Sequence, residues 1–90
     1  MADVTKELKV KGHVQGVGFR YAVCNHAHRL GVRGWVKNCS DGSVEALVQG
    51  DSRIIRQMID WIKAGPGLAH VESVQIGDAQ GEFHEFEIRY

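Results

Sequence analysis

Apolar and polar residues alternate along the first patterned stretch of the chain. Over residues 7–14 the apolar and small residues fall on one face and the basic residues on the other, with Leu8, Val10, Gly12 and Val14 opposite Lys9, Lys11 and His13. This period of two predicts a half-buried strand. From residue 19 to residue 30 the apolar positions fall three or four apart, at Phe19, Ala22, Val23, Ala27 and Leu30. That spacing predicts an amphipathic helix, and Gly31 suits its C-terminal cap.

The rest of the chain continues with three further strands, a second helix and a short last strand. Residues 32–38 and 43–49 predict two strands, which the Asp41-Gly42 turn joins into a hairpin. A second helix follows with Asp51 or Ser52 as its N-cap, an apolar face of Ile55, Met58, Ile59 and Ile62, and an end at Gly65-Pro66-Gly67. Residues 71–76 predict a fourth strand. After a turn at residues 77–81, alternating Phe86, Ile88 and Tyr90 predict a short closing strand.

This order of elements indicates the fold class. The sequence predicts an α+β, ferredoxin-like βαββαβ sandwich, in which an antiparallel sheet carries two helices on one face and a short closing strand is added. A chain of 90 residues has room for one domain, so we expect a single domain over residues 1–90.

Composition narrows the classes of partner. The chain has 11 Lys and Arg against 11 Asp and Glu, so bulk charge does not favour a nucleic-acid or membrane partner. It contains no apolar run of membrane-spanning length, and residues 1–6 lack the apolar stretch of a signal peptide. We therefore expect a cytoplasmic monomer that acts on a small molecule. Cys24 and Cys39 are expected as thiols in a reducing cytosol, although the sequence leaves a disulfide between them open.

Residues 12–20, Gly-His-Val-Gln-Gly-Val-Gly-Phe-Arg, join the first predicted strand to the first predicted helix. Glycines let the backbone approach a ligand closely, and a helix start presents unpaired N–H groups with partial positive charge. This combination favours an anion, and phosphate is the usual one. Arg20 adds a permanent charge with donors spaced for two phosphate oxygens. The segment therefore predicts a phosphate cradle made of backbone amides and one arginine.

The predicted topology brings a second polar residue to the cradle. A strand–helix–strand unit returns the chain in the same direction, so the first two strands end at one edge and Asn38 is expected close to Arg20. A last strand that turns back would bring Tyr90 there as well. The Asn38 amide can hold a water molecule beside a bound phosphate, but it cannot act as a base at neutral pH. Such an arrangement suits phosphoryl transfer from an activated phosphate, for example a mixed carboxylic–phosphoric anhydride.

Two motifs together resemble those of a known family. Residues 12–20 resemble the acylphosphatase signature Gly-x-Val-Gln-Gly-Val-x-Phe-Arg. Residues 34–38, Gly-Trp-Val-Lys-Asn, followed by Gly42-Ser43-Val44 and Gly50, resemble the second signature of that family. The resemblance covers essentially the whole chain, which is identified as a member of the acylphosphatase family.

The resemblance implies an activity and the residues that carry it. It implies hydrolysis of acyl phosphates to carboxylate and phosphate, with no cofactor and no metal ion. Arg20 and the backbone amides of the loop would bind the phosphate, the loop residues being Gln15, Gly16, Val17, Gly18, Phe19 and Arg20. Asn38 would position the attacking water, and the carboxylate of Tyr90 could orient Arg20, as a terminal carboxylate does in some members. Some members have threonine after the asparagine, where this chain has Cys39, a weaker hydrogen-bonding group.

Other readings of the same residues are less favoured. Cys24, His26 and His28 include a four-residue helical spacing typical of metal ligands, but further converging ligands are not evident. An RNA-binding sheet surface would need aromatic platforms on the central strands, which the first and third predicted strands lack. A domain at the start of a hydrogenase-maturation protein would be followed by zinc-ligand cysteine clusters, so we expect a free-standing enzyme. A regulatory anion-binding module is disfavoured because Asn38 is present.

Overall fold

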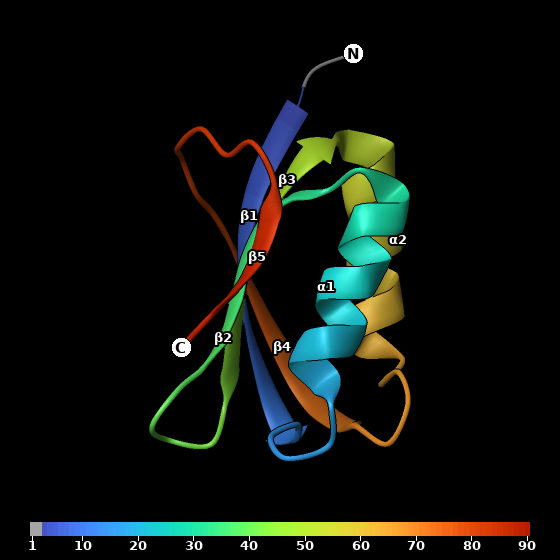
Figure 1. The fold of residues 1–90 in the computed structure, drawn as a ribbon, viewed down its shortest axis with the longest axis vertical. Helices are drawn as coiled ribbons and strands as arrows, with labels where there is room; N and C mark the ends of the chain where they lie inside the picture. The colour runs from blue at the N-terminus through green and yellow to red at the C-terminus, as the bar shows by residue number, and fades with distance from the viewer. Residues whose placement is uncertain (1–2) are drawn as a thin grey trace.

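The computed structural model describes residues 3–90 and confirms the α+β class. Both helices cover one face of a five-stranded sheet with the order β4-β1-β3-β2-β5, which is the ferredoxin-like arrangement with an added strand (Figure 1). The elements in chain order are β1 (Asp3–His13), α1 (Phe19–Leu30), β2 (Arg33–Asn38), β3 (Val44–Asp51), α2 (Ser52–Lys63), β4 (His70–Asp78) and β5 (Phe86–Arg89).

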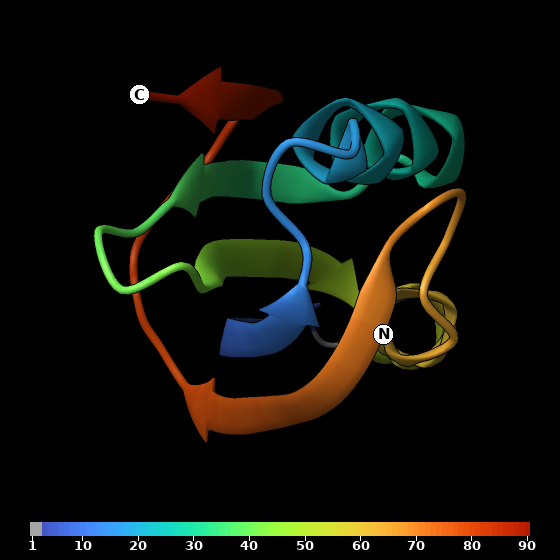
Figure 2. The same cartoon turned by 90° about the horizontal axis from the view of Figure 1, so that it is seen from below.

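The closing strand gives the sheet a mixed character. The neighbouring pairs among β4, β1, β3 and β2 are antiparallel, as the sequence predicts, whereas β5 lies parallel to β2. The connection between β4 and β5 carries the chain from one edge strand of the sheet to the other. Figure 2 shows that the connection runs along the face opposite the helices. Because β1, β2 and β5 all run in the same direction, they finish at the same end of the sheet.

Glycines fix both ends of α1, which begins and ends where the sequence predicts. Gly18 and Gly31 adopt left-handed conformations at its N-cap and C-cap, with φ of 76° and 72°. The helix places Phe19, Val23 and Ala27 in the core that it shares with α2 and the sheet. Within residues 3–90, neither helix has the length and apolar character that crossing a membrane requires.

The face of the sheet opposite the helices is partly covered. Leu47 and Gln49 alternate along β3 with the core residues Ala46 and Val48 and so lie on the outward face, yet both are buried. Gln49 Nε2 donates to the carbonyl oxygen of Gly81 at 2.7 Å, and Gln49 Oε1 accepts from the backbone N–H of Phe83 at 3.2 Å. The β4–β5 connection thus covers this part of the sheet, because Gln49 holds it there through hydrogen bonds.

Trp35 lies on the same outward face, near the edge formed by β5. Its ring contacts two cations, with Lys37 Nζ 5.5 Å and Arg89 Cζ 5.0 Å from the ring centroid. The one aromatic ring of β2 is therefore already in contact with side chains of this chain.

Candidate active site

The loop between β1 and α1 takes its shape from two glycines. Gly16 and Gly18 have φ of 74° and 76°, in the left-handed region that side chains disfavour. A Cβ atom at either position would meet no atom of residues 3–90 within 4 Å, so the requirement for glycine is conformational rather than steric. Left-handed residues in such a loop curl the backbone, so that successive N–H groups can face one anion.

The first turn of α1 is open to a ligand. Within residues 3–90, no side chain caps it, and the turn contains no acidic residue. The first backbone bond of the helix runs from the N–H of Ala22 to the carbonyl oxygen of Gly18, at 3.0 Å. The N–H groups that precede it are those that every helix leaves without an internal partner. They carry partial positive charge from the helix dipole and suit an anion.

A pocket of about 190 Å³ lies at this helix start and brings the two predicted residues together. Its lining combines loop residues, the first turn of α1 and the end of β2, namely Val14, Gly16, Gly18, Phe19, Arg20, Tyr21 and Asn38. Arg20 and Asn38 thus share one pocket, as the predicted topology requires. Of the other predicted loop residues, Gln15 and Val17 are not part of this lining.

Asn38 ends β2 on the side of the sheet that faces the helices. It is two residues from fully buried Val36 and pairs with Val44, which is also fully buried. Its side-chain oxygen Oδ1 is buried and has no hydrogen-bond partner within residues 3–90. Leaving a buried acceptor unpaired costs about 1–3 kcal/mol, so such atoms are rare in folded proteins. In a pocket, this oxygen is a ready acceptor for a donor supplied by a ligand or a water molecule.

The guanidinium of Arg20 contacts an aromatic ring. Its Cζ atom lies 5.0 Å from the centroid of the Tyr90 ring, and the ion pairs found within residues 3–90 do not include Arg20. The family resemblance implies that the Tyr90 carboxylate could orient Arg20, and in the structure it is the Tyr90 ring that contacts the guanidinium. Stacking uses the flat face of the guanidinium and leaves its in-plane N–H donors available to a phosphate.

The side chain of Gln15 connects the loop to the turn that follows Asn38. Its Nε2 donates to the carbonyl oxygens of Cys39 at 2.8 Å and Ser43 at 2.9 Å. Sequence reasoning considered only the backbone amide of Gln15. The sequence signal for this role was that an amide side chain with two donors lies in a loop, where it can bind backbone carbonyl oxygens. Through Gln15, the segments that carry Arg20 and Asn38 hold each other in place.

Cys39 differs from what its position beside Asn38 suggests. Its thiol donates to Glu45 Oε1 at 3.1 Å. Burial raises the pKa of the Cys39 thiol, and the hydrogen bond with Glu45 raises it further. The thiol therefore bonds to Glu45 and, within residues 3–90, makes no hydrogen bond that would orient the Asn38 side chain.

The turn after β2 is held by a network around Asp41. Asp41 Oδ1 accepts from the backbone N–H of Ser43 at 3.0 Å and from its hydroxyl at 2.5 Å, while Asp41 Oδ2 lies 3.1 Å from Lys9 Nζ. The hydrogen bonds from Ser43, and then the interaction with Lys9, hold the pKa of the Asp41 carboxyl well below its usual range. The network makes the turn next to Asn38 a defined structure.

The two histidines and the one cysteine of α1 make hydrogen-bonding and stacking contacts within the chain. His28 Nε2 lies 2.9 Å from the carbonyl oxygen of Phe86 and 3.7 Å from Cys24 Sγ, and the ring of His26 stacks on Trp61 with centroids 4.0 Å apart. Within residues 3–90, no three or more His, Cys, Asp or Glu side chains gather as metal ligands would. Cys24 and Cys39 are both free thiols.

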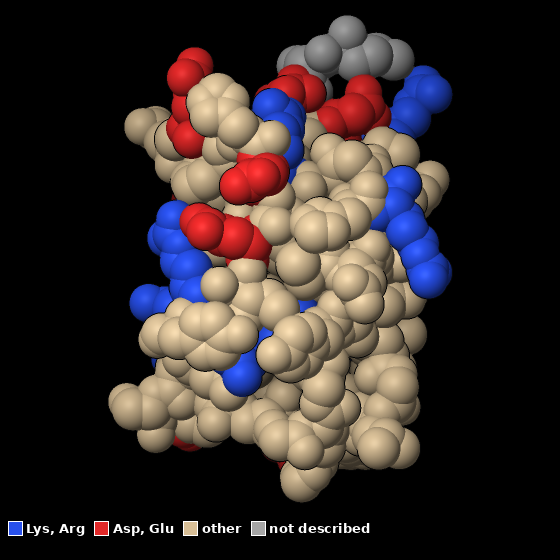
Figure 3. All heavy atoms as spheres, in the orientation of Figure 1, with Lys and Arg blue, Asp and Glu red and all other residues tan. Residues whose placement is uncertain are grey.

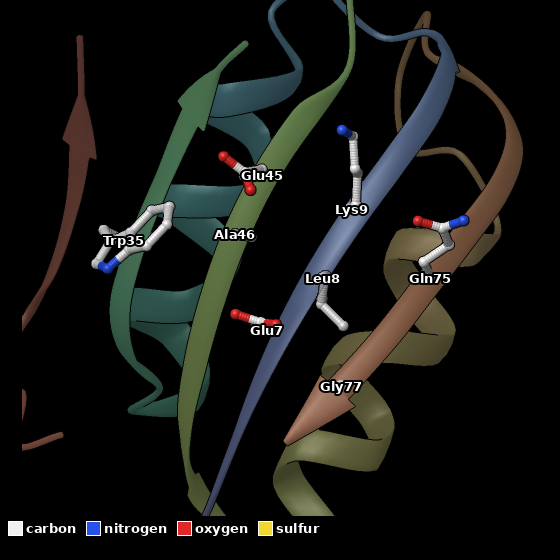
Figure 4. A pocket seen from close by; sticks show the side chains of 8 residues that line it. All are labelled: Glu7, Leu8, Lys9, Trp35, Glu45, Ala46, Gln75 and Gly77. Carbon is white, nitrogen blue, oxygen red and sulfur yellow. The ribbon is translucent and has the colours of Figure 1, made fainter. Parts of the chain in front are cut away.

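A second depression, of about 180 Å³, lies on the opposite face of the sheet (Figure 4). Glu7, Glu45 and Trp35 contribute to its lining, with Lys9 at one end. Its basic group is already paired with Asp41, and its two carboxylates would repel a phosphate. None of the predicted site residues lines it, so we take the pocket at the start of α1 as the candidate active site.

Comparisons with known proteins agree with this geometry. The family model for acylphosphatase matches residues 6–88. An acylphosphatase of Thiobacillus denitrificans is 49% identical over 85 residues, which are 94% of this chain and 96% of the relative. The crystal structure of an acylphosphatase from Bacillus subtilis superposes with a TM-score of 0.91 at 34% identity, covering 97% of this chain and 99% of the other.

A larger protein contains a similar domain. Full-length HypF, solved in a phosphate- and nucleotide-bound form, matches with a TM-score of 0.88 at 27% identity. The match covers 99% of this chain but only 12% of HypF. The acylphosphatases of Thiobacillus denitrificans and Bacillus subtilis, by contrast, match over nearly their whole length. Fold, motifs and relatives lead to one conclusion: this chain belongs to the acylphosphatase family of enzymes, which hydrolyse acyl phosphates.

Proposed function

We propose that this protein hydrolyses the carboxyl–phosphate bond of acyl phosphates, with Arg20 and the loop amides binding the phosphate and Asn38 positioning the attacking water. The observation that carries the proposal is the shared pocket, in which Asn38 Oδ1 is buried without a partner and Arg20 forms no ion pair within residues 3–90. Both groups are left available for a ligand at the uncapped start of α1.

Phosphate binding relies on donors that are already in place. The N–H groups at the start of α1 and those of residues 15–20 supply hydrogen bonds and partial positive charge. Arg20 supplies the full charge and two parallel donors. Because these groups are fixed before the substrate arrives, they can stabilise the charge on the equatorial phosphate oxygens as the reaction proceeds.

The chemical step needs a positioned water rather than a strong base. Asn38 Oδ1 accepts a hydrogen bond from the water and holds it beside phosphorus. The water oxygen forms a bond to phosphorus while the bond between phosphorus and the acyl oxygen breaks, and the carboxylate leaves with the electron pair. The water proton passes to a phosphate oxygen of the substrate. Among the residues that the structure describes, those that line the pocket include no carboxylate or imidazole side chain, which fits this route.

The leaving group explains why the site needs no general acid. A carboxylate is stable as an anion at neutral pH, so it departs without being protonated. An alkoxide leaving group from a phosphate monoester is far more basic and would require a proton donor. The proposed substrates are therefore acyl phosphates, and the proposed reaction needs no metal ion or cofactor.

The test is hydrolysis of benzoyl phosphate by the purified protein, with and without EDTA. We expect turnover that EDTA does not reduce. Asn38→Ala should lower kcat by about 100-fold or more, because a misplaced nucleophile loses the benefit of positioning. Inorganic phosphate should still raise the Tm of this variant. Asn25→Ala, at an exposed asparagine of α1, serves as the matched control and should keep the activity of the unmodified protein.

Two results would contradict the proposal. Normal turnover by an Asn38→Ala variant that circular dichroism shows to be folded would mean that another group positions the attacking water. An unmodified protein that gains Tm with inorganic phosphate but hydrolyses no acyl phosphate would be an anion-binding module instead.

A further inference from the structure

A groove lies between α2 and the first residues of β1, apart from the candidate active site. Its volume is about 290 Å³. The residues that line it come from both elements, namely Val4, Lys6, Ser52, Ile55, Arg56, Ile59, Asp60 and Lys63. All eight differ from the residues found to line the pocket at the start of α1. The proposed function therefore leaves this groove without a role.

The groove forms where β1 extends beyond its neighbour β4. In the pairing of these two strands, Asp78 of β4 lies opposite Lys6, whereas β1 begins earlier, at Asp3. Val4 and Lys6 alternate with buried Leu8, so they lie on the face of the sheet that the helices cover. The start of β1 thus lies beside α2 but beyond the end of β4, which leaves space between helix and strand.

The floor of the groove is apolar. Ile55 is 2% exposed and belongs to the core, while Val4 and Ile59 are half-buried and pack against that core. Ile59 belongs to the apolar face that the sequence predicts for α2, yet the chain leaves it partly uncovered. Such a floor favours an apolar group of a ligand, because contact removes apolar area from water.

The sides of the groove carry a surplus of positive charge. Lys6, Arg56 and Lys63 contribute cations, and Asp60 contributes a carboxylate. Lys6 is paired with Asp78, whereas the ion pairs found within residues 3–90 include neither Arg56 nor Lys63. When the two aspartates are set against the three cations, one positive charge remains. The groove therefore suits a ligand with a single negative charge.

The groove is remote from the candidate active site. Figures 1 and 2 show α2 on the β1 and β4 side of the sheet and α1 on the β2 and β5 side. Figure 3 shows the α1 and β5 side, where the lower part, over the start of α1, is mostly uncharged. β1 leads from the groove to the phosphate loop, a distance of about 30 Å at the usual rise of a strand. One small ligand cannot occupy both sites.

We propose that this groove binds a free carboxylate with an apolar chain, such as an ionised medium-chain carboxylic acid. Arg56 and Lys63 hold the carboxylate, for which the arginine offers two parallel donors, and the chain lies on Val4 and Ile59. A phosphate monoester fits less well, because it carries about two negative charges at neutral pH. The inference goes beyond the proposed hydrolysis and uses no residue of the candidate active site.

The experiment is isothermal titration calorimetry with octanoate, below the concentration at which it forms micelles. We expect one saturable site, with much weaker binding of acetate, which lacks the chain, and of octanol, which lacks the charge. Arg56→Gln should weaken octanoate binding about three- to tenfold, because it removes charge-assisted hydrogen bonds. The matched control is Arg53→Gln, at an exposed cation of the same helix outside the groove lining, which should keep the affinity.

Two further measurements place the chain of the ligand. Ile59→Ala should reduce the gain in affinity from hexanoate to octanoate, because it removes part of the apolar floor. In NMR spectra, octanoate should shift the backbone amide resonances of Val4 and Ile59 and leave those of Gly16 and Gly18 in place. Shifts confined to the phosphate loop would overturn the inference.

Other outcomes also count against this groove as a carboxylate site. The inference fails if octanoate shows no saturable binding, or if Arg56→Gln and Arg53→Gln change its affinity equally. Loss of octanoate binding in Arg20→Gln would place the carboxylate in the pocket at the start of α1 instead. Binding to vesicles of anionic lipid without binding of octanoate would assign the cations to a membrane surface. Hydrolysis of benzoyl phosphate is a separate assay, so the proposed function and this inference stand or fall independently.

Discussion

The two helices have the same length but begin in different ways. Both have 12 residues, and the first turn of α2 is capped by Asp51, whose carboxylate accepts from the N–H of Arg53 at 3.0 Å. The first turn of α1 follows left-handed Gly18, and within residues 3–90 no side chain caps it. An N-cap side chain is worth about 1 kcal/mol, so α1 lacks a stabilising interaction that α2 has.

The difference shows which helix start is available for a ligand. In α2 one donor of the first turn, the N–H of Arg53, is already paired with the Asp51 carboxylate, so an added anion would compete with Asp51. In α1 the donors lie in a pocket beside Arg20 and the unpaired oxygen of Asn38. The missing cap is therefore explained by the proposed phosphate, which would take the place of the capping carboxylate.

We expect the largest effect when the positive charge of Arg20 is removed from the pocket at the start of α1. Arg20→Gln should lower kcat/KM by about 100- to 1,000-fold and remove the rise in Tm with inorganic phosphate, because it deletes the charged donors of the pocket. The matched control is Arg29→Gln at the other end of the same helix, which should change kcat/KM by less than about twofold. Phosphate affinity that survives Arg20→Gln would show that the amides suffice, and would remove Arg20 from the proposed site.

A smaller effect is expected where the loop is attached to the turn after β2. Gln15→Ala removes the two hydrogen bonds to the carbonyl oxygens of Cys39 and Ser43. We expect the free energy of unfolding to fall by about 1–3 kcal/mol and kcat to fall about tenfold. Urea denaturation and benzoyl phosphate kinetics measure the two quantities. Gln57→Ala, at an exposed position of α2, is the control. If Gln15→Ala loses stability without any loss of kcat, Gln15 has a structural role only.

Removing the cap of α2 should separate helix stability from ligand binding. Asp51→Ala should lower the free energy of unfolding by about 1 kcal/mol, because it leaves an N–H of the first turn without its partner. Since α2 lies outside the site, we expect unchanged kcat and the same rise in Tm with phosphate as in the unmodified protein. Asp60→Ala, on an exposed part of the same helix, should have a smaller effect on stability. A reduced response to phosphate in Asp51→Ala would contradict the comparison of the two helix starts.

The smallest expected effect is a pH dependence of stability. The pKa of Asp41 is lower in the folded protein than in the unfolded chain, so the unfolded chain takes up the proton first as the pH falls. The stabilisation by the Asp41 carboxylate is therefore present above pH about 4 and is lost progressively below it. Asp41→Asn should show a shallower loss of stability between pH 4 and pH 2 than the unmodified protein, as measured by urea denaturation. Identical slopes would show that other carboxylates dominate acid unfolding.

Local signals made most of the fold predictable from the sequence. The bounds of α1 follow from its apolar spacing between two glycines, and the cap of α2 follows to within one residue, because Asp51 and Ser52 both precede an amphipathic run and the structure uses Asp51. The meeting of Arg20 and Asn38 in one pocket also follows, because chain direction across a strand–helix–strand unit is fixed. These features depend on neighbours in sequence or on topology alone.

Other features depend on contacts between distant segments and could not be predicted. The burial of Gln49 requires the β4–β5 connection to cross the sheet, and no local pattern shows where that connection lies. The thiol of Cys39 bonds to Glu45 on the neighbouring strand, which depends on the register of the hairpin. The contact of Arg20 with the Tyr90 ring joins the first helix to the end of the last strand.

The strand order has a consequence for how the protein is made. β1 lies between β3 and β4, so it gains its first sheet neighbour only after residue 51 and its second only after residue 78 has been synthesised. Until then the strand that leads into the phosphate loop has open edges, which invite pairing with other chains. A ribosome must therefore complete most of this chain before the loop has a rigid support, and nascent fragments that end before β4 would be prone to aggregate.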